Sequence, residues 1–150
     1  MSEIIFKIEP INESQHVEIA DVWEASVRAT HDFLHEEDIL FFRELILEKY
    51  VHSAKIECIK NKANKIVGFI SVAKQNIDML FIHPDYRGKG VGKFFMEYAI
   101  ETKQANKVDV NEQNNQAVGF YQYFGFKTVT RSELDPTGKP YPVLHMELKK

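Results

Sequence analysis

A glycine-rich segment with basic flanks is the part of the sequence whose residue types and spacing best suit chemistry. Glycines let the backbone turn tightly and approach a ligand closely. A helix expected directly after the segment would offer unpaired N–H groups and the positive end of its dipole. The pattern therefore predicts a phosphate or pyrophosphate site, made of Arg87, Gly88, Lys89, Gly90, Val91, Gly92 and Lys93.

Three phosphate-binding patterns compete for this segment. A nucleotide P-loop needs Gly-Lys followed by Ser or Thr, but Gly92-Lys93 is followed by Phe94. A dinucleotide fingerprint needs a third glycine at the position of Lys93. The pattern Arg/Gln-x-x-Gly-x-Gly/Ala is satisfied by Arg87, Gly90 and Gly92. A glycine-rich turn that binds nothing is the remaining interpretation, because short motifs also occur by chance.

The elements that would position this segment follow from the periodicity of apolar residues. Apolar residues recur every four positions at Ile19, Trp23 and Val27, which is typical of a helix. Helices are expected at about 14–28, 37–50, from the glycine segment to about 104, and 115–124. Strands are expected at 4–9, 55–59, 65–72, 76–82, 107–110, 126–129 and 143–148. This order, βααβββαβαββ, predicts a mixed α+β fold in a single domain over residues 1–150.

The strand at 76–82 should present two faces. Strict alternation places Ile77, Met79 and Phe81 on one face and Asp78, Leu80 and Ile82 on the other. Pro84 ends the strand.

Composition excludes several function classes. A chain of 150 residues with a net charge of −3 has no basic run suited to duplex nucleic acid. No apolar run approaches the ~18 residues that would span a bilayer, and the N-terminus does not read as a signal peptide. The one cysteine, Cys58, forms no intrachain disulfide and is expected in the core. We therefore expect a cytoplasmic protein without a nucleic-acid or membrane partner.

Two motifs at a set distance resemble the GNAT superfamily of N-acetyltransferases. Leu80-Phe81-Ile82-His83-Pro84, followed by the glycine segment, is similar to that family's strand-and-loop motif. Asn114-x-x-Ala117-x-x-Phe120-Tyr121-x-x-x-Gly125-Phe126 is similar to its next helix and turn. Residues 29–34, 111–114 and 138–142 also resemble a bacterial YjaB-type subgroup. With these segments the resemblance spans nearly the whole chain.

The resemblance implies a mostly antiparallel mixed sheet flanked by helices on both faces. One pair of parallel strands, 76–82 and 107–110, would splay apart and hold acetyl-CoA. Backbone groups of Leu80, Phe81 and Ile82 would pair with the pantetheine arm, and the glycine segment with Lys93 would hold the pyrophosphate. Asn114 and Tyr121 would also contact the cofactor, although Asn114 is equally suited to capping its helix. No metal is expected, because His31 and His35 lack an HExxH motif.

The implied chemistry is direct attack of a primary amine on the thioester, without an acyl-enzyme. Tyr121 would act as general acid toward the departing sulfur, although helical spacing alone favours a core aromatic. Asp78 and His31 are the candidates for general base, and His31 could instead contact the substrate. The alternative functions are an acetyl-CoA-binding sensor module without transferase activity and a nucleotide-binding protein that uses the same loop.

The acceptor is expected to be a small-molecule or peptide amine. Its pocket is predicted to include His31, Asp32, Phe33, Asn111 and Tyr141. The segment around Tyr141 is equally suited to forming a rigid connection between strands. A homodimer is a further expectation, since edge-strand dimers are common in the resembled family.

Overall fold

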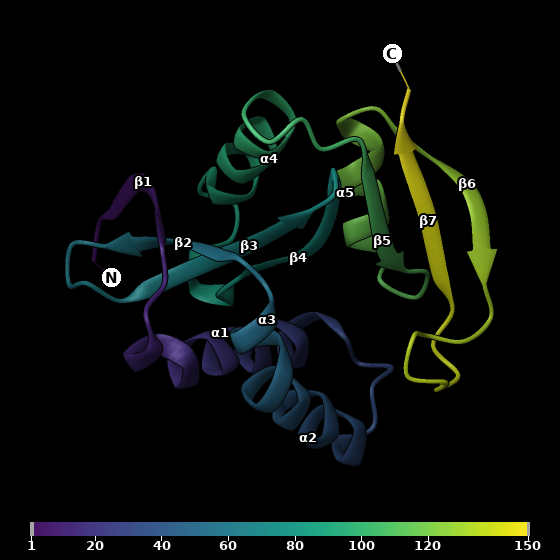
Figure 1. Cartoon of the computed structure of the whole chain (residues 1–150), viewed down its shortest axis with the longest axis horizontal. Helices are drawn as coiled ribbons and strands as arrows, with labels where there is room; N and C mark the ends of the chain where they lie inside the picture. Colours follow the sequence, from purple (N-terminus) through teal and green to yellow (C-terminus); the bar gives the residue numbers. More distant parts are fainter. Residues whose placement is uncertain (1, 150) are drawn as a thin grey trace.

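The computed structural model describes residues 2–149, which form one sheet of seven strands with helices on both faces (Figure 1). The strand order is β1-β2-β3-β4-β5-β7-β6, and every neighbouring pair is antiparallel except the parallel pair β4 and β5. The expected α+β class and mixed sheet are confirmed. The strand bounds are β1 Ile4–Pro10, β2 Ile56–Asn61, β3 Ile66–Ala73, β4 Asn76–Ile82, β5 Lys107–Asn111, β6 Phe126–Ser132 and β7 Val143–Leu148.

The helices pack in two groups, one on each face of the sheet (Figure 1). One face is covered by α1 and α2, whose apolar residues pack with Phe69 and Cys58. The other face is covered by α4 and α5, with Phe95 and Phe126 at its centre. The helix bounds are α1 His16–Thr30, α2 Glu36–Leu45, α3 Val51–Ser53, α4 Val91–Glu101 and α5 Asn115–Tyr123. Burial raises the pKa of the Cys58 thiol to about 11, so this cysteine is an inert core residue as expected.

Three element ends differ from the prediction by three residues each, and the other differences are smaller. The helix expected to end at residue 50 continues through a π-helical turn, Ile46–Tyr50, into α3. Helix α4 ends at Glu101, before Gln104, whose positive φ of 56° does not suit a helix. Strand β6 runs on to Ser132 because an irregularity between Thr128 and Thr130 hides its pairing from a simple alternation rule.

Strands β4 and β5 pair over a very short length and then separate. Their register contains only the pairs Asn76–Lys107 and Ile77–Val108. Figure 1 shows β4 and β5 diverging, with α5 beside the gap. The unpaired backbone of β4 beyond Ile77 is therefore available to a ligand that adds as a strand.

A bulge in β4 changes which side chains share a face. Ser71 of β3 lies opposite Met79, whereas Val72 lies opposite Ile77, so Asp78 is the extra residue. Ile77 consequently packs in the α4 cluster, on the side of Leu80 and Ile82. The expected alternation is therefore wrong at this point. Asp78 does not share a face with Leu80 but lines a cavity with Met79, on the α1 and α2 face.

Gly68 in β3 tests how tightly the sheet is packed against α4. A Cβ at this position would lie 2.9 Å from Ile82 Cδ1, 3.1 Å from the Phe81 carbonyl oxygen and 3.2 Å from Phe95 Cε2. We expect Gly68→Ala to lower the free energy of unfolding by about 1–3 kcal/mol because the core must shift to make room. Urea unfolding followed by circular dichroism measures this change.

Gly119 in α5 offers the matched control. A Cβ there meets no atom within 4 Å. Gly119→Ala should leave the free energy of unfolding unchanged or raise it by up to about 1 kcal/mol, through better helix propensity. Equal effects of the two substitutions would contradict the tight packing inferred at Gly68.

Candidate active site

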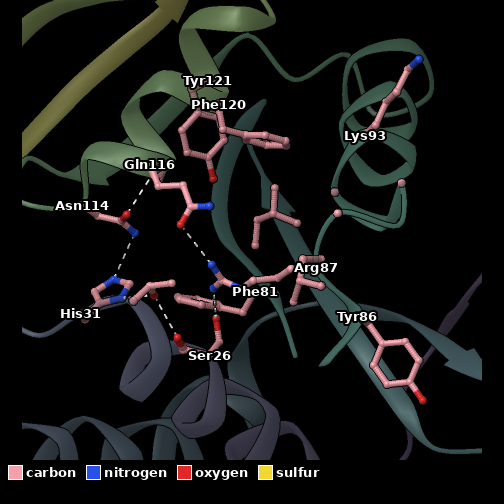
Figure 2. Close-up of a pocket in the computed structure, with 17 residues that line it drawn as sticks. Ser26, His31, Phe81, Tyr86, Arg87, Lys93, Asn114, Gln116, Phe120 and Tyr121 are labelled. Atoms are coloured by element: carbon pink, nitrogen blue, oxygen red, sulfur yellow. Dashed lines mark hydrogen bonds between the residues drawn. The ribbon is translucent and has the colours of Figure 1, made fainter. Parts of the chain in front are cut away.

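A pocket of about 370 Å³ lies where β4 separates from β5, between α1, α4 and α5. Figure 2 shows its lining side chains arriving from all of these elements. Most of the sequence-predicted cofactor residues line it, namely Leu80, Phe81, Ile82, Arg87, Gly88, Gly90, Gly92, Lys93, Asn114 and Tyr121. Lys89 is exposed and outside this lining, and the side chain of Val91 is buried in the core at the start of α4.

The glycine loop has the backbone conformation that its sequence predicts. Gly88 and Gly90 have φ values of 71° and 90°, in the left-handed region where a side chain would be strained. Gly90 is the N-cap of α4, so the amides of the first turn face the pocket end of the helix. Gly92 serves close packing instead, because a Cβ there would lie 3.2 Å from Phe120 Cζ.

Arg87 is a half-buried cation that crosses the pocket (Figure 2). Its Nη2 donates to Ser26 Oγ of α1 at 3.2 Å, and its Nη1 donates to Gln116 Oε1 of α5 at 3.3 Å. Its Nε is buried and has no hydrogen-bond partner among residues 2–149. Desolvation lowers the pKa of the guanidinium. A buried guanidinium with an unsatisfied donor and only neutral partners is suited to binding an anion.

The polar groups of Lys93 and Tyr121 point in opposite directions relative to this pocket. In Figure 2 the ammonium of Lys93 points away from the centre, toward solvent. The hydroxyl of Tyr121 points into the pocket from α5 (Figure 2), while its ring packs edge-on to Phe120 and Phe126. Burial raises the pKa of the Tyr121 phenol, so the group stays protonated and able to donate. The ring of Tyr121 packs in the core, as helical spacing alone favoured, and the residue also lines the pocket, while its role as general acid stays a prediction.

His31 links the end of α1 to the start of α5. Thr30 Oγ1 lies 2.8 Å from its Nδ1 and donates its own proton to the Ser26 carbonyl, so Nδ1 carries the histidine proton. Asn114 Nδ2 then donates to Nε2 at 3.4 Å (Figure 2), while Asn114 Oδ1 caps α5 by accepting from the Ala117 amide. Burial, and next the charge of Arg87, lower the pKa of His31 to about 4. The imidazole is therefore neutral at pH 7.

Two further cavities open on the other side of His31. One of about 270 Å³ shares His31 and Phe81 with the first pocket and is also lined by Asp78, Asn111 and Tyr141. The next, of about 890 Å³, shares Asp78 and Asn111 with it. Because neighbouring cavities share lining residues, the three cavities lie one after another along a path from the glycine loop to the β6–β7 connection.

The predicted acceptor residues are brought together only in part. His31, Asn111 and Tyr141 line the middle cavity, and Phe33 stacks near His31 and Tyr141 at centroid distances of 5.1 and 6.2 Å. Asp32 is exposed and lines none of the three cavities. The side chain of Tyr141 is turned inward, where its hydroxyl donates to Asp38 of α2.

Sequence reasoning missed the two residues that hold Arg87. Ser26 is a small polar residue within the buried stripe of α1, and this mismatch in the apolar pattern was the available signal. Gln116 lies two positions after Asn114 in the first turn of α5 and carries no such signal. His, Cys and carboxylate side chains of residues 2–149 do not gather into a group of three or more that could hold a metal ion.

Comparison with known proteins agrees with this geometry. Residues 40–149 match the family model of the acetyltransferase (GNAT) domain. The chain belongs to the GNAT family. It is 42% identical to the peptidyl-lysine N-acetyltransferase YjaB of Escherichia coli (strain K12), over 91% of this chain and 94% of that protein.

Solved structures of GNAT proteins share the fold. The solution structure of apo YjaB from Escherichia coli matches with a TM-score of 0.86 and 40% identity, covering 94% of this chain and 95% of that chain. The PaiA N-acetyltransferase of Thermoplasma acidophilum, solved in complex with coenzyme A, matches with a TM-score of 0.68 and 21% identity, covering 96% and 98%. This chain is thus an N-acetyltransferase of the GNAT family, and its resemblance to the YjaB-type subgroup is confirmed.

The neutral state of His31 makes the stability of this GNAT enzyme depend on pH. The folded protein keeps His31 unprotonated down to about pH 4, whereas the unfolded chain takes up the proton near 6.5. The unfolded state therefore binds more protons between these values, and the free energy of unfolding falls as the pH is lowered from 6.5 to 4. We expect the loss from this group to approach about 3 kcal/mol.

Urea unfolding of the wild type and of His31→Gln at pH 7.5 and pH 4.5 isolates this contribution. The wild type should lose more stability than the variant, whereas His52→Gln, at an exposed histidine, should follow the wild type. Equal losses in the wild type and His31→Gln would show that His31 titrates normally in the fold.

Proposed function

We propose that this enzyme transfers the acetyl group of acetyl-CoA to the ε-amine of lysine side chains in peptides or proteins. The observation that carries the proposal is the shared boundary of two cavities. The pocket beside the glycine loop and the middle cavity meet at His31 and Phe81, so a thioester held in one can face an amine held in the other. The YjaB relative, named a peptidyl-lysine N-acetyltransferase, supports lysine as the acceptor.

The residues of the first pocket fit coenzyme A. The unsatisfied Nε of Arg87 and the amides at the start of α4 suit a pyrophosphate, and the unpaired edge of β4 at Leu80–Ile82 suits the pantetheine amides. The coenzyme A complex of the similarly folded PaiA protein supports this choice of ligand. When bound, acetyl-CoA supplies the activated acetyl group.

Tyr121 and the backbone of β4 have the main roles around the reacting carbonyl. We assign Tyr121 to protonating or hydrogen-bonding the departing sulfur, because its hydroxyl points into the pocket and stays protonated (Figure 2). A backbone N–H near Leu80 is our candidate for the donor that stabilises the oxyanion. Asn114 is held by two hydrogen bonds at the boundary of the cavities and orients His31.

The two candidates for general base, His31 and Asp78, have different roles in this proposal. The Nε2 of His31 already accepts a hydrogen bond from Asn114 Nδ2, so it has no free lone pair for the proton of a lysine ammonium. We therefore assign His31 to shaping the boundary between the two cavities, where its ring can contact the acceptor. Asp78 is exposed to the acceptor cavities, and we assign its carboxylate to attracting the ammonium and taking its proton through water.

Other expectations about partners and location stay predictions. They are a cytoplasmic location, a homodimer, and the lack of a nucleic-acid or membrane partner. Among residues 2–149, no helix combines the length and apolar character needed to cross a membrane.

Arg87 tests the cofactor pocket. We expect Arg87→Gln to weaken acetyl-CoA binding at least about tenfold, because a charged hydrogen bond to phosphate contributes about 1.5–3 kcal/mol. Lys93→Gln is the matched control, since its ammonium points out of the pocket and its loss should weaken binding less (Figure 2). Isothermal titration calorimetry measures both affinities. A larger effect at Lys93 would show that the phosphates lie elsewhere.

Acetylation of lysine peptides tests the proposed function, and Tyr121→Phe tests its mechanism. The wild type should convert lysine to N-acetyl-lysine, detected by mass spectrometry of a peptide library incubated with acetyl-CoA. Tyr121→Phe should lower kcat about 100-fold. Its affinity for acetyl-CoA should change less than about threefold, because the ring keeps its packing.

Two outcomes would count against these assignments. Unchanged kcat in Tyr121→Phe would leave Tyr121 as a core residue only. Tight acetyl-CoA binding by the wild type, without acetylation of any lysine or small amine, would favour the sensor interpretation.

A further inference from the structure

Three polar side chains outside the cofactor pocket form a hydrogen-bonded chain across adjacent strands. Ser132 Oγ of β6 lies 2.7 Å from His145 Nε2 of β7. His145 Nδ1 lies 2.7 Å from Asp109 Oδ1 of β5. Neither the acetyl transfer proposed above nor the sequence motifs assign a role to these residues.

The register of the sheet fixes this arrangement. Asp109 lies directly opposite His145 on neighbouring antiparallel strands. His145 is opposite Thr130 on its other side, and Ser132 is two positions further along β6. Since residues i and i+2 of a strand point to the same face, the three side chains meet on one face of the sheet.

The two hydrogen bonds define the roles of the three groups. The Asp109 carboxylate can only accept, so His145 Nδ1 carries a proton and Nε2 presents its lone pair to Ser132. The Ser132 hydroxyl then donates to Nε2 and can lose its proton to it. A hydroxyl beside a base that a carboxylate orients is the arrangement of a serine nucleophile, whatever the fold or the order of residues along the chain.

These three residues also line the cavity of about 890 Å³ at the outer end of the path. Apolar walls are provided by Val72, Leu134, Pro136 and Val143. Lys55 adds a positive charge to the lining that could attract a developing oxyanion. His145 and Asp109 are 36% and 50% exposed, so a small molecule can reach Ser132 from solvent.

We propose that Ser132, His145 and Asp109 form a second reactive site that hydrolyses small acyl esters. Ser132 Oγ bonds to the ester carbonyl carbon and gives its proton to His145 Nε2. The bond to the alcohol oxygen breaks, and that oxygen leaves with the proton from His145. Water then attacks the acyl-serine in the same way, which releases the carboxylic acid and restores the Ser132 hydroxyl.

The exposure of Asp109 sets the expected scale of this activity. Solvent weakens the interaction between a half-exposed carboxylate and an imidazolium, compared with the buried carboxylate of a dedicated hydrolase. We expect turnover of an activated ester such as p-nitrophenyl acetate rather than of amides. The site shares its cavity with the proposed acceptor path, but its chemistry uses neither acetyl-CoA nor Tyr121.

A fluorophosphonate probe, followed by peptide mapping, tests the proposal, because it bonds to activated serines with loss of fluoride. Ser132 should be labelled in the native wild type and not in the urea-unfolded protein. His145→Ala and Asp109→Asn should each label at least about tenfold more slowly. Ser53 is the matched control, since it lines the same cavity but its hydroxyl donates to the Lys49 carbonyl at 3.0 Å, so it should stay unlabelled.

Hydrolysis of p-nitrophenyl acetate gives the second readout. Ser132→Ala should lose the activity, whereas Ser53→Ala should keep it. Thermal unfolding of each variant checks that the fold is retained. Absence of labelling at Ser132, or labelling that does not depend on His145, would reduce the three residues to a polar network between strands. Loss of lysine acetylation alone would count against the proposed function and not against this site.

Discussion

The separation of β4 from β5 is the constraint on which the rest of this structure depends. Strand β5 keeps only two residue pairs with β4 and then pairs fully with β7. A sheet that opens in this way exposes backbone donors and acceptors in its interior, which costs free energy unless another group pairs with them. The gap is stable because α5 packs beside it, with Tyr121 and Phe120 closing its apolar side. The cofactor pocket is thus a consequence of the topology and not of a hollow on the surface.

Arg87 places a positive charge beside this opening that no carboxylate among residues 2–149 neutralises. An arginine paired with a carboxylate at this place would be satisfied and would compete with any anionic ligand. Here it is held by a serine and a glutamine from two different helices, which fix its direction but leave its charge uncompensated. The same charge helps to keep His31 neutral. One side chain therefore leaves a free charge at the proposed anion site and adds to the effect of burial that keeps His31 neutral.

The sequence predicted the framework and the conformation of the glycine loop well, because both depend on local signals. The glycines with positive φ, the Asn114 cap and the periodic apolar faces act within a few residues of one another. The face of Asp78 could not be predicted, since it depends on a bulge that is defined only by pairing with β3. The two hydrogen-bond partners of Arg87, Ser26 and Gln116, could not be predicted either, because they lie far from Arg87 and from each other in the sequence. Ser132 was missed for a similar reason, as its strand was expected to end at residue 129.

The acceptor side is built by a different rule from the cofactor side. Its walls come from the turn after α1 and from the β6–β7 connection, which are not paired to each other by backbone ladders. Side chains join them instead. Tyr141 and Lys139 both bind the carboxylate of Asp38. These hydrogen bonds, that from Tyr141 first and that from Lys139 second, hold the pKa of the Asp38 carboxyl below its usual range. The Lys139 ammonium also lies 4.6 Å from the Phe41 ring centre.

A wall held by a few buried side chains can change without disturbing the sheet. The contacts of Tyr141 and Lys139 with Asp38 join the β6–β7 connection to α2, and neither contact involves β4, α4 or the glycine loop. The proposed cofactor site, made by the backbone of β4, the glycine loop and Arg87, is therefore separable in this fold from the proposed acceptor site. That separation explains how one framework can keep a single acyl donor while the shape and charge of the acceptor cavity determine which amine it meets.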